Sequence, residues 1–100
     1  MGMRIPIPEW MRNVLSADPF MRLCIVAHEC SGRVEWHHAF TYGGKRINEL
    51  WAILPLCKKH HDHLTRHVQT LCRMALRMRI EFFKARDYFS ITYPKSDLFS

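Results

Sequence analysis

Residues 37–61 begin and end with a pair of histidines, and a double glycine and a Leu-Pro-Leu-Cys segment lie between the pairs. Histidine is the commonest metal ligand and the side chain that most readily exchanges a proton near neutral pH. A fold that brought the two pairs together would create a metal centre. This segment therefore restricts the architecture more than any other part of the chain.

The length of 100 residues corresponds to a single domain spanning residues 1–100. A domain of this size has a thin core, which a bound metal would help to stabilise. We find no secretory signal and no apolar run of 18 residues, so we expect a cytoplasmic protein with reduced thiols and no membrane contact. The net charge of +6 favours a polyanionic partner, most often nucleic acid, although a merely soluble basic surface is the alternative.

The order of sequence patterns predicts an α+β fold, with one short helix before the histidines and a long helical segment after them. Residues 8–16 should form the first helix, because Pro8 suits a first turn and Asp18-Pro19 should end it. A further helical turn is expected at 19–24. Two strands, 33–40 and 51–56, should flank a loop that contains Gly43-Gly44, and the second helical segment should begin at Cys57. The last segment lacks Gly and Pro for over thirty residues, so we expect a bend near 66–69. Four basic residues of this segment recur at spacings of seven, four and seven and share one helix face: Arg66, Arg73, Arg77 and Lys84. This face is either simply solvated or a stripe that binds successive phosphates of a nucleic acid.

Three cysteines and one histidine are candidate ligands of a structural Zn²⁺: Cys24, Cys30, Cys57 and His60. The Cys57-x-x-His60 spacing lets one helical turn present both side chains to one ion, and thiolate with imidazole favours zinc. His28 could replace Cys30 or His60 in this set. The competing interpretation is that Cys24 and Cys57 are buried apolar residues, which is what we expect for Cys72.

A second group consists of His37, His38 and His61. His37 and His38 should point to opposite sides of a strand, and His61 is turned by about 100° from His60 on a helix. If the strands fold back onto that helix, His37 and His61 can meet at an ion distinct from the zinc. The alternative is that these histidines are structural or share one zinc cluster.

The segments "EWHH", "GGKR" and "LPLCKKHH" resemble the HNH endonucleases of the ββα-metal superfamily, in particular small phage-borne members related to recombination-enhancement nucleases. The resemblance covers residues 24–67 as the core motif. It implies a β-hairpin packed on a helix with a zinc knuckle, in which His60 stands where many members have a second cysteine. It also implies a bacterial host or phage as the source.

The resemblance further implies roles for individual residues. His37 and His61 would bind the catalytic ion, and His38 would be the general base. The middle asparagine of the family stands about five residues before the knuckle cysteine, where this chain has Ala52. Asn48, nine residues before Cys57, is the nearest asparagine and the candidate for that role. A further helix ligand of some members corresponds to Thr65, for which His63 or His67 could substitute.

These roles imply a metal-dependent DNA endonuclease with one catalytic divalent ion, Mg²⁺, Mn²⁺, Ni²⁺ or Zn²⁺, and a histidine base. Its partners would be DNA, including single-stranded or branched DNA, and a recombination protein. Arg46, Lys58 and Lys59 are candidate phosphate contacts, or else ordinary exposed charges. The alternative function is a non-catalytic, zinc-stapled basic module that binds DNA or a recombination protein.

Overall fold

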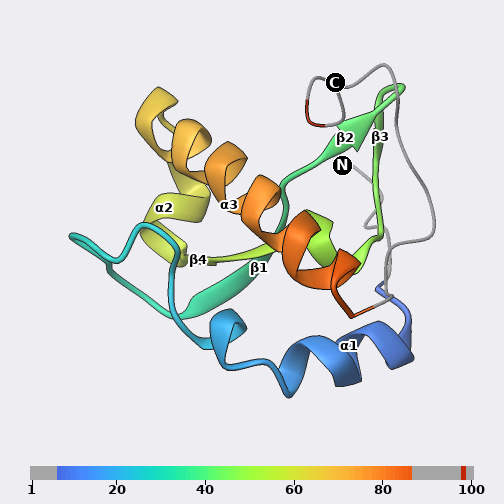
Figure 1. Ribbon diagram of the computed structural model, residues 1–100. Helices are drawn as coiled ribbons and strands as arrows, with labels where there is room; N and C mark the ends of the chain where they lie inside the picture. Colours follow the sequence, from blue (N-terminus) through green and yellow to red (C-terminus); the bar gives the residue numbers. More distant parts are fainter. Residues whose placement is uncertain (1–6, 87–97, 99–100) are drawn as a thin grey trace.

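A computed structural model describes residues 7–86 and 98 and has an α+β architecture (Figure 1). The elements before the sheet are α1, Glu9–Ser16, and a 3-10 turn η1, Pro19–Arg22. Strand β1, Val34–His38, pairs antiparallel with β4, Ile53–Cys57, and the small hairpin β2–β3, Thr41–Tyr42 and Lys45–Arg46, lies between them in the chain. The 3-10 turn η2, Leu50–Ala52, precedes β4, and the helices α2, Lys58–Asp62, and α3, Arg66–Lys84, follow it.

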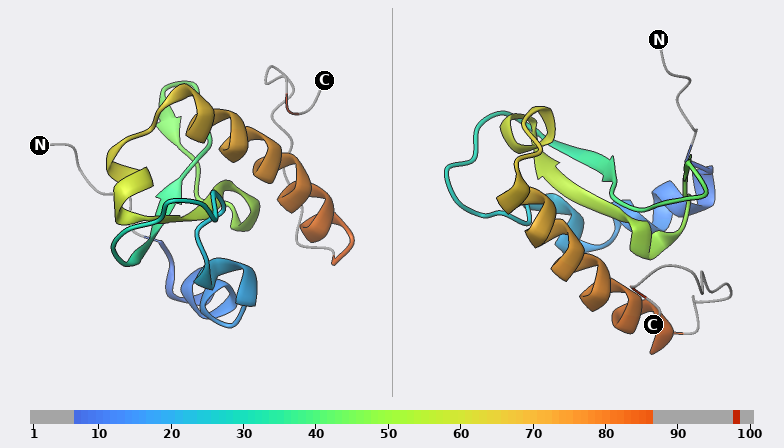
Figure 2. Two further views of the ribbon diagram at one scale, coloured as in Figure 1. Left: turned by 90° about the vertical axis from the view of Figure 1, so that its left-hand side faces the viewer. Right: turned by 90° about the horizontal axis from the view of Figure 1, so that it is seen from above.

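The β1–β4 pair lies at the centre of the domain, between α3 and the N-terminal elements (Figures 1 and 2). All five residues of β4 are buried, as expected for a strand covered on both faces. The register places His37 opposite Leu54 and His38 opposite Ile53. The two histidines therefore stand at the end of β1 that leads into the β2–β3 hairpin.

The hairpin turns at Gly43-Gly44, where both residues have positive φ, +60° and +77°. A two-residue turn of this kind requires positive φ at both positions, which glycine adopts without steric cost. Tyr42 pairs with Lys45 across the turn. The segment expected to be a loop thus contains a two-residue strand on each side of the Gly43-Gly44 turn.

Helix α3 packs a buried stripe against η2 and β4, with members at helical spacing: Val68, Cys72, Leu76, Ile80 and Phe83. Arg79 lies within this stripe and is 3 % exposed. Its Nη2 donates to Oδ2 of Asp18 at 2.6 Å, and its guanidinium lies 4.1 Å from the ring centroid of Phe20. This contact fastens η1 to α3 across 61 residues of sequence.

Two of the boundaries that differ from the sequence expectation have a local cause. The bend expected near 66–69 is a full break at 63–65, because the Thr65 hydroxyl accepts a hydrogen bond from the Val68 amide and begins α3 anew. The strand expected over 51–56 begins only at Ile53, since the Ala52 amide donates to the Glu49 carbonyl in η2. The sequence of the C-terminal tail, residues 90–100, predicts an extended segment, which lies outside the described residues apart from residue 98. No helix of the described segments is long and apolar enough to cross a membrane.

Candidate metal centre and histidine site

The four predicted zinc ligands form one cluster. One ligand atom from each of Cys24, Cys30, Cys57 and His60 lies within 4.8 Å of the others. Nδ1 of His60 is 3.6, 3.9 and 3.1 Å from the sulfurs of Cys24, Cys30 and Cys57. A tetrahedral Zn²⁺ with bonds of about 2.3 Å to sulfur and about 2.0 Å to nitrogen separates such atoms by about 3.5 Å. The cluster therefore has the donor set and the size for a structural Zn²⁺.

Residues 24–33 bring Cys24 and Cys30 to this cluster through a loop with three left-handed residues. Ala27, Glu29 and Gly32 have φ of 55°, 51° and 84°. A Cβ at Gly32 would lie 2.8 Å from Cβ of Lys58, so only glycine lets the loop pass this close to α2. The amide of Lys59 donates to the Ser31 carbonyl at 3.1 Å and fixes the loop there.

The thiols of the cluster differ in how readily they ionise. Partial desolvation, together with the thiols of Cys24 and Cys57, raises the pKa of Cys30 to about 11. Burial opposes ionisation of Cys57, but hydrogen bonds from the backbone of His60 and Ser31 outweigh it and lower the pKa of this thiol. Without a metal, the cluster thus favours ionisation of Cys57 and disfavours that of Cys30. A divalent cation would allow several thiolates to coexist.

His28 and Cys72 both lie outside the cluster. His28 is exposed and is not part of the four-residue cluster, so it does not take the place of Cys30 or His60. Cys72 is buried in the core, as predicted, and burial raises its pKa to about 11.

Two members of the second histidine group, His37 and His61, lie next to each other. His37 comes from β1 and His61 from α2, and their ring centroids are 5.1 Å apart at an interplanar angle of 63°. Two imidazoles bound to one ion at about 90–110° have centroids about 4.5–5.2 Å apart, given metal–nitrogen bonds of about 2.1 Å. The separation is thus compatible with joint coordination of one ion.

Glu35 belongs to this site, although sequence reasoning did not select it. Its Oε1 lies 2.9 Å from Nδ1 of His61, and Nε of Arg33 donates to its Oε2 at 3.2 Å. The hydrogen bond with His61, and then that with Arg33, lowers the pKa of Glu35 against the opposing effect of desolvation. The signal was present in the alternation of β1, since residues 35 and 37 share one face of a strand.

His37 is kept in its neutral form. Burial, followed by the nearby charges of His61, His38 and Arg46, lowers its pKa to about 4. A neutral imidazole has a lone pair for a metal, whereas a protonated one has none.

His38 contacts Asn48, with Nε2 lying 2.7 Å from Oδ1. The asparagine that contacts His38 is therefore Asn48, the one that most closely precedes Cys57 in the sequence, and position 52 does not fill this role. Ala52 is fully buried and has no polar side chain, and its carbonyl accepts a hydrogen bond from the Ala39 amide. If Nε2 of His38 donates to Asn48, then Nδ1 is left as an acceptor.

The remaining candidates are exposed or have other contacts. The Thr65 hydroxyl is used as the cap of α3, and His63 and His67 are exposed. Nζ of Lys58 pairs with Asp62 at 2.8 Å, and Nζ of Lys59 donates to the Glu29 carbonyl at 3.0 Å. Both lysines therefore already have intramolecular partners.

Comparison of the chain with protein-family models, curated proteins and solved structures finds no match. Any functional conclusion therefore depends on the sites themselves.

Proposed function

We propose that the chain is a metal-dependent DNA endonuclease of the HNH type, with a structural Zn²⁺ and one catalytic divalent ion. The observation that carries this proposal is the meeting of His37 and His61 at 5.1 Å, next to a His38 that contacts Asn48 at 2.7 Å. A strand and a helix far apart in sequence thus supply two candidate ligands, and the neighbouring residue supplies a candidate base. The resemblance noted in the sequence assigns the same roles to the same positions.

The proposed roles follow from the hydrogen bonds. Glu35 accepts the Nδ1 proton of His61, which fixes the ring and leaves Nε2 available as a ligand. Asn48 accepts the Nε2 proton of His38, so Nδ1 can take a proton from the attacking water. Arg46, on the exposed β3 strand of the neighbouring hairpin, would supply positive charge for the phosphate. When bound, the ion would stabilise negative charge on the phosphate and the leaving oxygen.

The test is nicking of supercoiled plasmid by the zinc-loaded protein in Mg²⁺ or Mn²⁺. His38→Ala should keep its zinc and lose at least about 10²-fold in rate, the usual effect of a lost general base. His28→Ala is the matched control, because His28 is exposed and is not part of the metal cluster. Equal nicking by wild type and His38→Ala, or no nicking by wild type with any divalent ion, would refute the proposal.

One observation favours a second candidate, a zinc-stapled module that binds DNA or a recombination protein without cutting. Among the described residues, the Cys24, Cys30, Cys57 and His60 cluster is the only group of three or more His, Cys, Asp or Glu with ligand atoms close enough to hold an ion. Metal counting separates the candidates. One firmly held zinc with no second site would support the binding module, whereas a second, exchangeable ion would support the enzyme.

A further inference from the structure

The outward face of α3 carries a stripe of residues, here called the outer stripe, whose spacing alternates between four and three: His67, Leu71, Met74, Met78 and Glu81. It lies opposite the core, because Met74 is turned by about 160° on the helix from the buried Cys72. Met74 and Met78 are 55 % and 71 % exposed, and Leu71 is half-buried. Alternation of four and three is the spacing by which one helix packs along another. The middle of the outer stripe is therefore an apolar, solvent-exposed surface with the pattern of a helix–helix contact.

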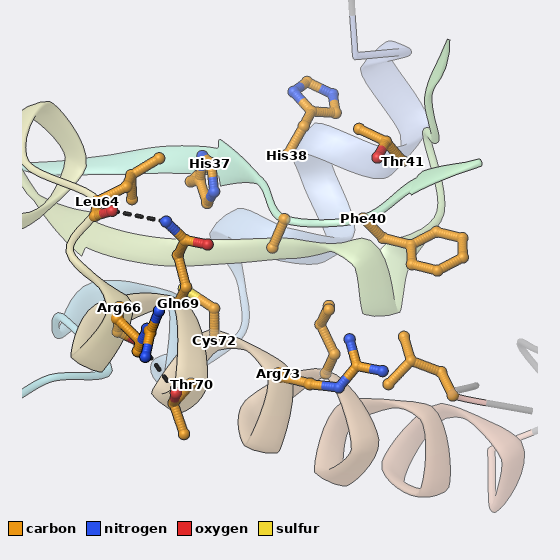
Figure 3. A pocket seen from close by; sticks show the side chains of 13 residues that line it. His37, His38, Phe40, Thr41, Leu64, Arg66, Gln69, Thr70, Cys72 and Arg73 are labelled. Atoms are coloured by element: carbon orange, nitrogen blue, oxygen red, sulfur yellow. Dashed lines mark hydrogen bonds between the residues drawn. The ribbon is translucent and has the colours of Figure 1, made fainter. Parts of the chain in front are cut away.

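The outer stripe is separate from the side of α3 that faces the histidine site. In Figure 3, Gln69 extends from α3 toward His37, across a pocket that His38 also lines. Gln69 is turned by about 140° on the helix from Met74. A second helix packed on the outer stripe would therefore lie away from His37 and His38.

The two ends of the outer stripe differ in charge. His67 lies in the first turn of α3 next to the cation Arg66, whereas Glu81 lies in the last turn. The Glu81 side chain is 76 % exposed, and its ion pair with Lys84 is long, at 3.8 Å between Oε1 and Nζ. Met74 stands seven residues from each end, about 10 Å along the helix axis. The outer stripe thus has an apolar centre, a basic end and an acidic end at equal distances from that centre.

We propose that the outer stripe binds a second copy of this chain, with the two α3 helices antiparallel about a two-fold axis at Met74. In this arrangement the apolar centres meet, and His67 of each chain faces Glu81 of the other at both ends. A parallel pairing would instead place Glu81 against Glu81 and His67 against His67. The stripe is therefore complementary to itself in the antiparallel arrangement, which identifies a second copy as the partner.

The position of α3 allows this contact. The helix runs along one outer side of the domain, so a second helix can approach most of its length (Figure 2). A contact through one helix of 19 residues is small for a permanent dimer. We therefore expect a weak, reversible dimer with a dissociation constant of about 10–100 µM.

The test is sedimentation equilibrium of the zinc-loaded full-length protein at about 5–500 µM, a range that spans the expected dissociation constant. About 0.15 M salt screens the repulsion between two chains of net charge +6. The mean mass should rise with concentration from 12.0 kDa toward twice that value. A mass of 12.0 kDa at every concentration would overturn the proposal and leave the stripe to a different protein.

Substitution of the apolar centre tests where the chains meet. Met74→Lys and Met78→Lys should each raise the dissociation constant at least about 10-fold, because they place ammonium groups of the two chains together. Trp10→Lys is the matched control, since Trp10 is also a large exposed apolar residue but lies on α1. It should change the dissociation constant less than about 3-fold, because it alters only long-range repulsion. Equal effects of Trp10→Lys and Met74→Lys would overturn the proposal.

Charge reversal tests the antiparallel arrangement. His67→Glu and Glu81→Lys should each weaken association about 5- to 30-fold, because like charges then meet at both ends. The double variant His67→Glu/Glu81→Lys restores opposite charges only in the antiparallel pair, and its dissociation constant should return to within about 3-fold of wild type. The two positions are about 21 Å apart along one helix, so this rescue cannot arise within a single chain. A double variant as weak as the two single variants combined would overturn the proposal, and zinc content with melting temperature verifies that each variant is folded.

Discussion

Cys30→Ala should destabilise this domain more than Cys72→Ala, although Cys30 is exposed and Cys72 is buried. Burial alone predicts the opposite order. Substitution of an exposed side chain usually changes stability by no more than about 0.5 kcal/mol, and truncation of a small buried one costs about 1 kcal/mol. The order is reversed only if Cys30 binds a metal that stabilises the fold.

The magnitude follows from how residues 24–33 are held. This segment contains no helix or strand, and within the described residues three backbone hydrogen bonds join it to β4 and α2: Ile25 to Pro55, Lys58 to Arg33 and Lys59 to Ser31. At about 1 kcal/mol net each, these supply about 3 kcal/mol. Structural zinc contributes about 10–16 kcal/mol in small zinc-finger peptides, which exceeds the contribution of the loop itself.

Loss of one of four ligands should therefore cost at least about 3 kcal/mol, or about 12–24 °C in melting temperature for a domain of this size. Cys72→Ala should lower the melting temperature by about 4–8 °C and retain one zinc per chain. Thermal unfolding is followed by circular dichroism in a reducing agent, and zinc is counted with a chromogenic chelator after unfolding. A Cys30→Ala protein with full zinc content and an unchanged melting temperature would refute the reasoning.

Three further predictions concern other contacts. Asp18→Asn should lower the free energy of unfolding by about 3 kcal/mol, because it leaves the guanidinium of Arg79 buried without a counter-charge; adding Arg79→Met should recover most of this in urea unfolding, and strictly additive losses would contradict the idea. Glu35→Ala should weaken binding of the proposed catalytic ion about 10- to 100-fold in a metal titration while zinc content stays constant; an unchanged affinity would argue against Glu35 as the residue that orients the His61 ring. Gly32→Ala should cost about 1–3 kcal/mol through its 2.8 Å clash with α2, more than Gly43→Ala, where the added Cβ meets nothing within 4 Å; equal melting temperatures would show that the loop can move aside.

Local patterns predicted much of this fold. The first helix was expected over 8–16 and spans Glu9–Ser16, because the signals that begin and end it are adjacent in sequence. The four zinc ligands were predicted from residue type and spacing, and the structure brings them together. The capping role of Thr65 was also present in the sequence, and it would have placed the helix break correctly.

Contacts between distant segments could not be predicted in this way. The pairing of Arg79 with Asp18 joins residues 61 positions apart, and a buried arginine contradicts the apolar pattern of its helix face. The resemblance named Asn48 as a candidate, but its contact with His38 depends on the β2–β3 hairpin folding back on itself, which the spacing to Cys57 does not reveal. Such contacts depend on the whole topology rather than on any local preference.

Helix α2 is only five residues long, Lys58–Asp62, and it contains both His60 and His61. His60 belongs to the cysteine cluster, whereas His61 faces Glu35 and His37. So short a helix depends on its tertiary contacts to persist. Loss of zinc should therefore disorder both imidazoles together. The availability of zinc would then determine the fraction of chains in which His61 is held next to Glu35 and His37.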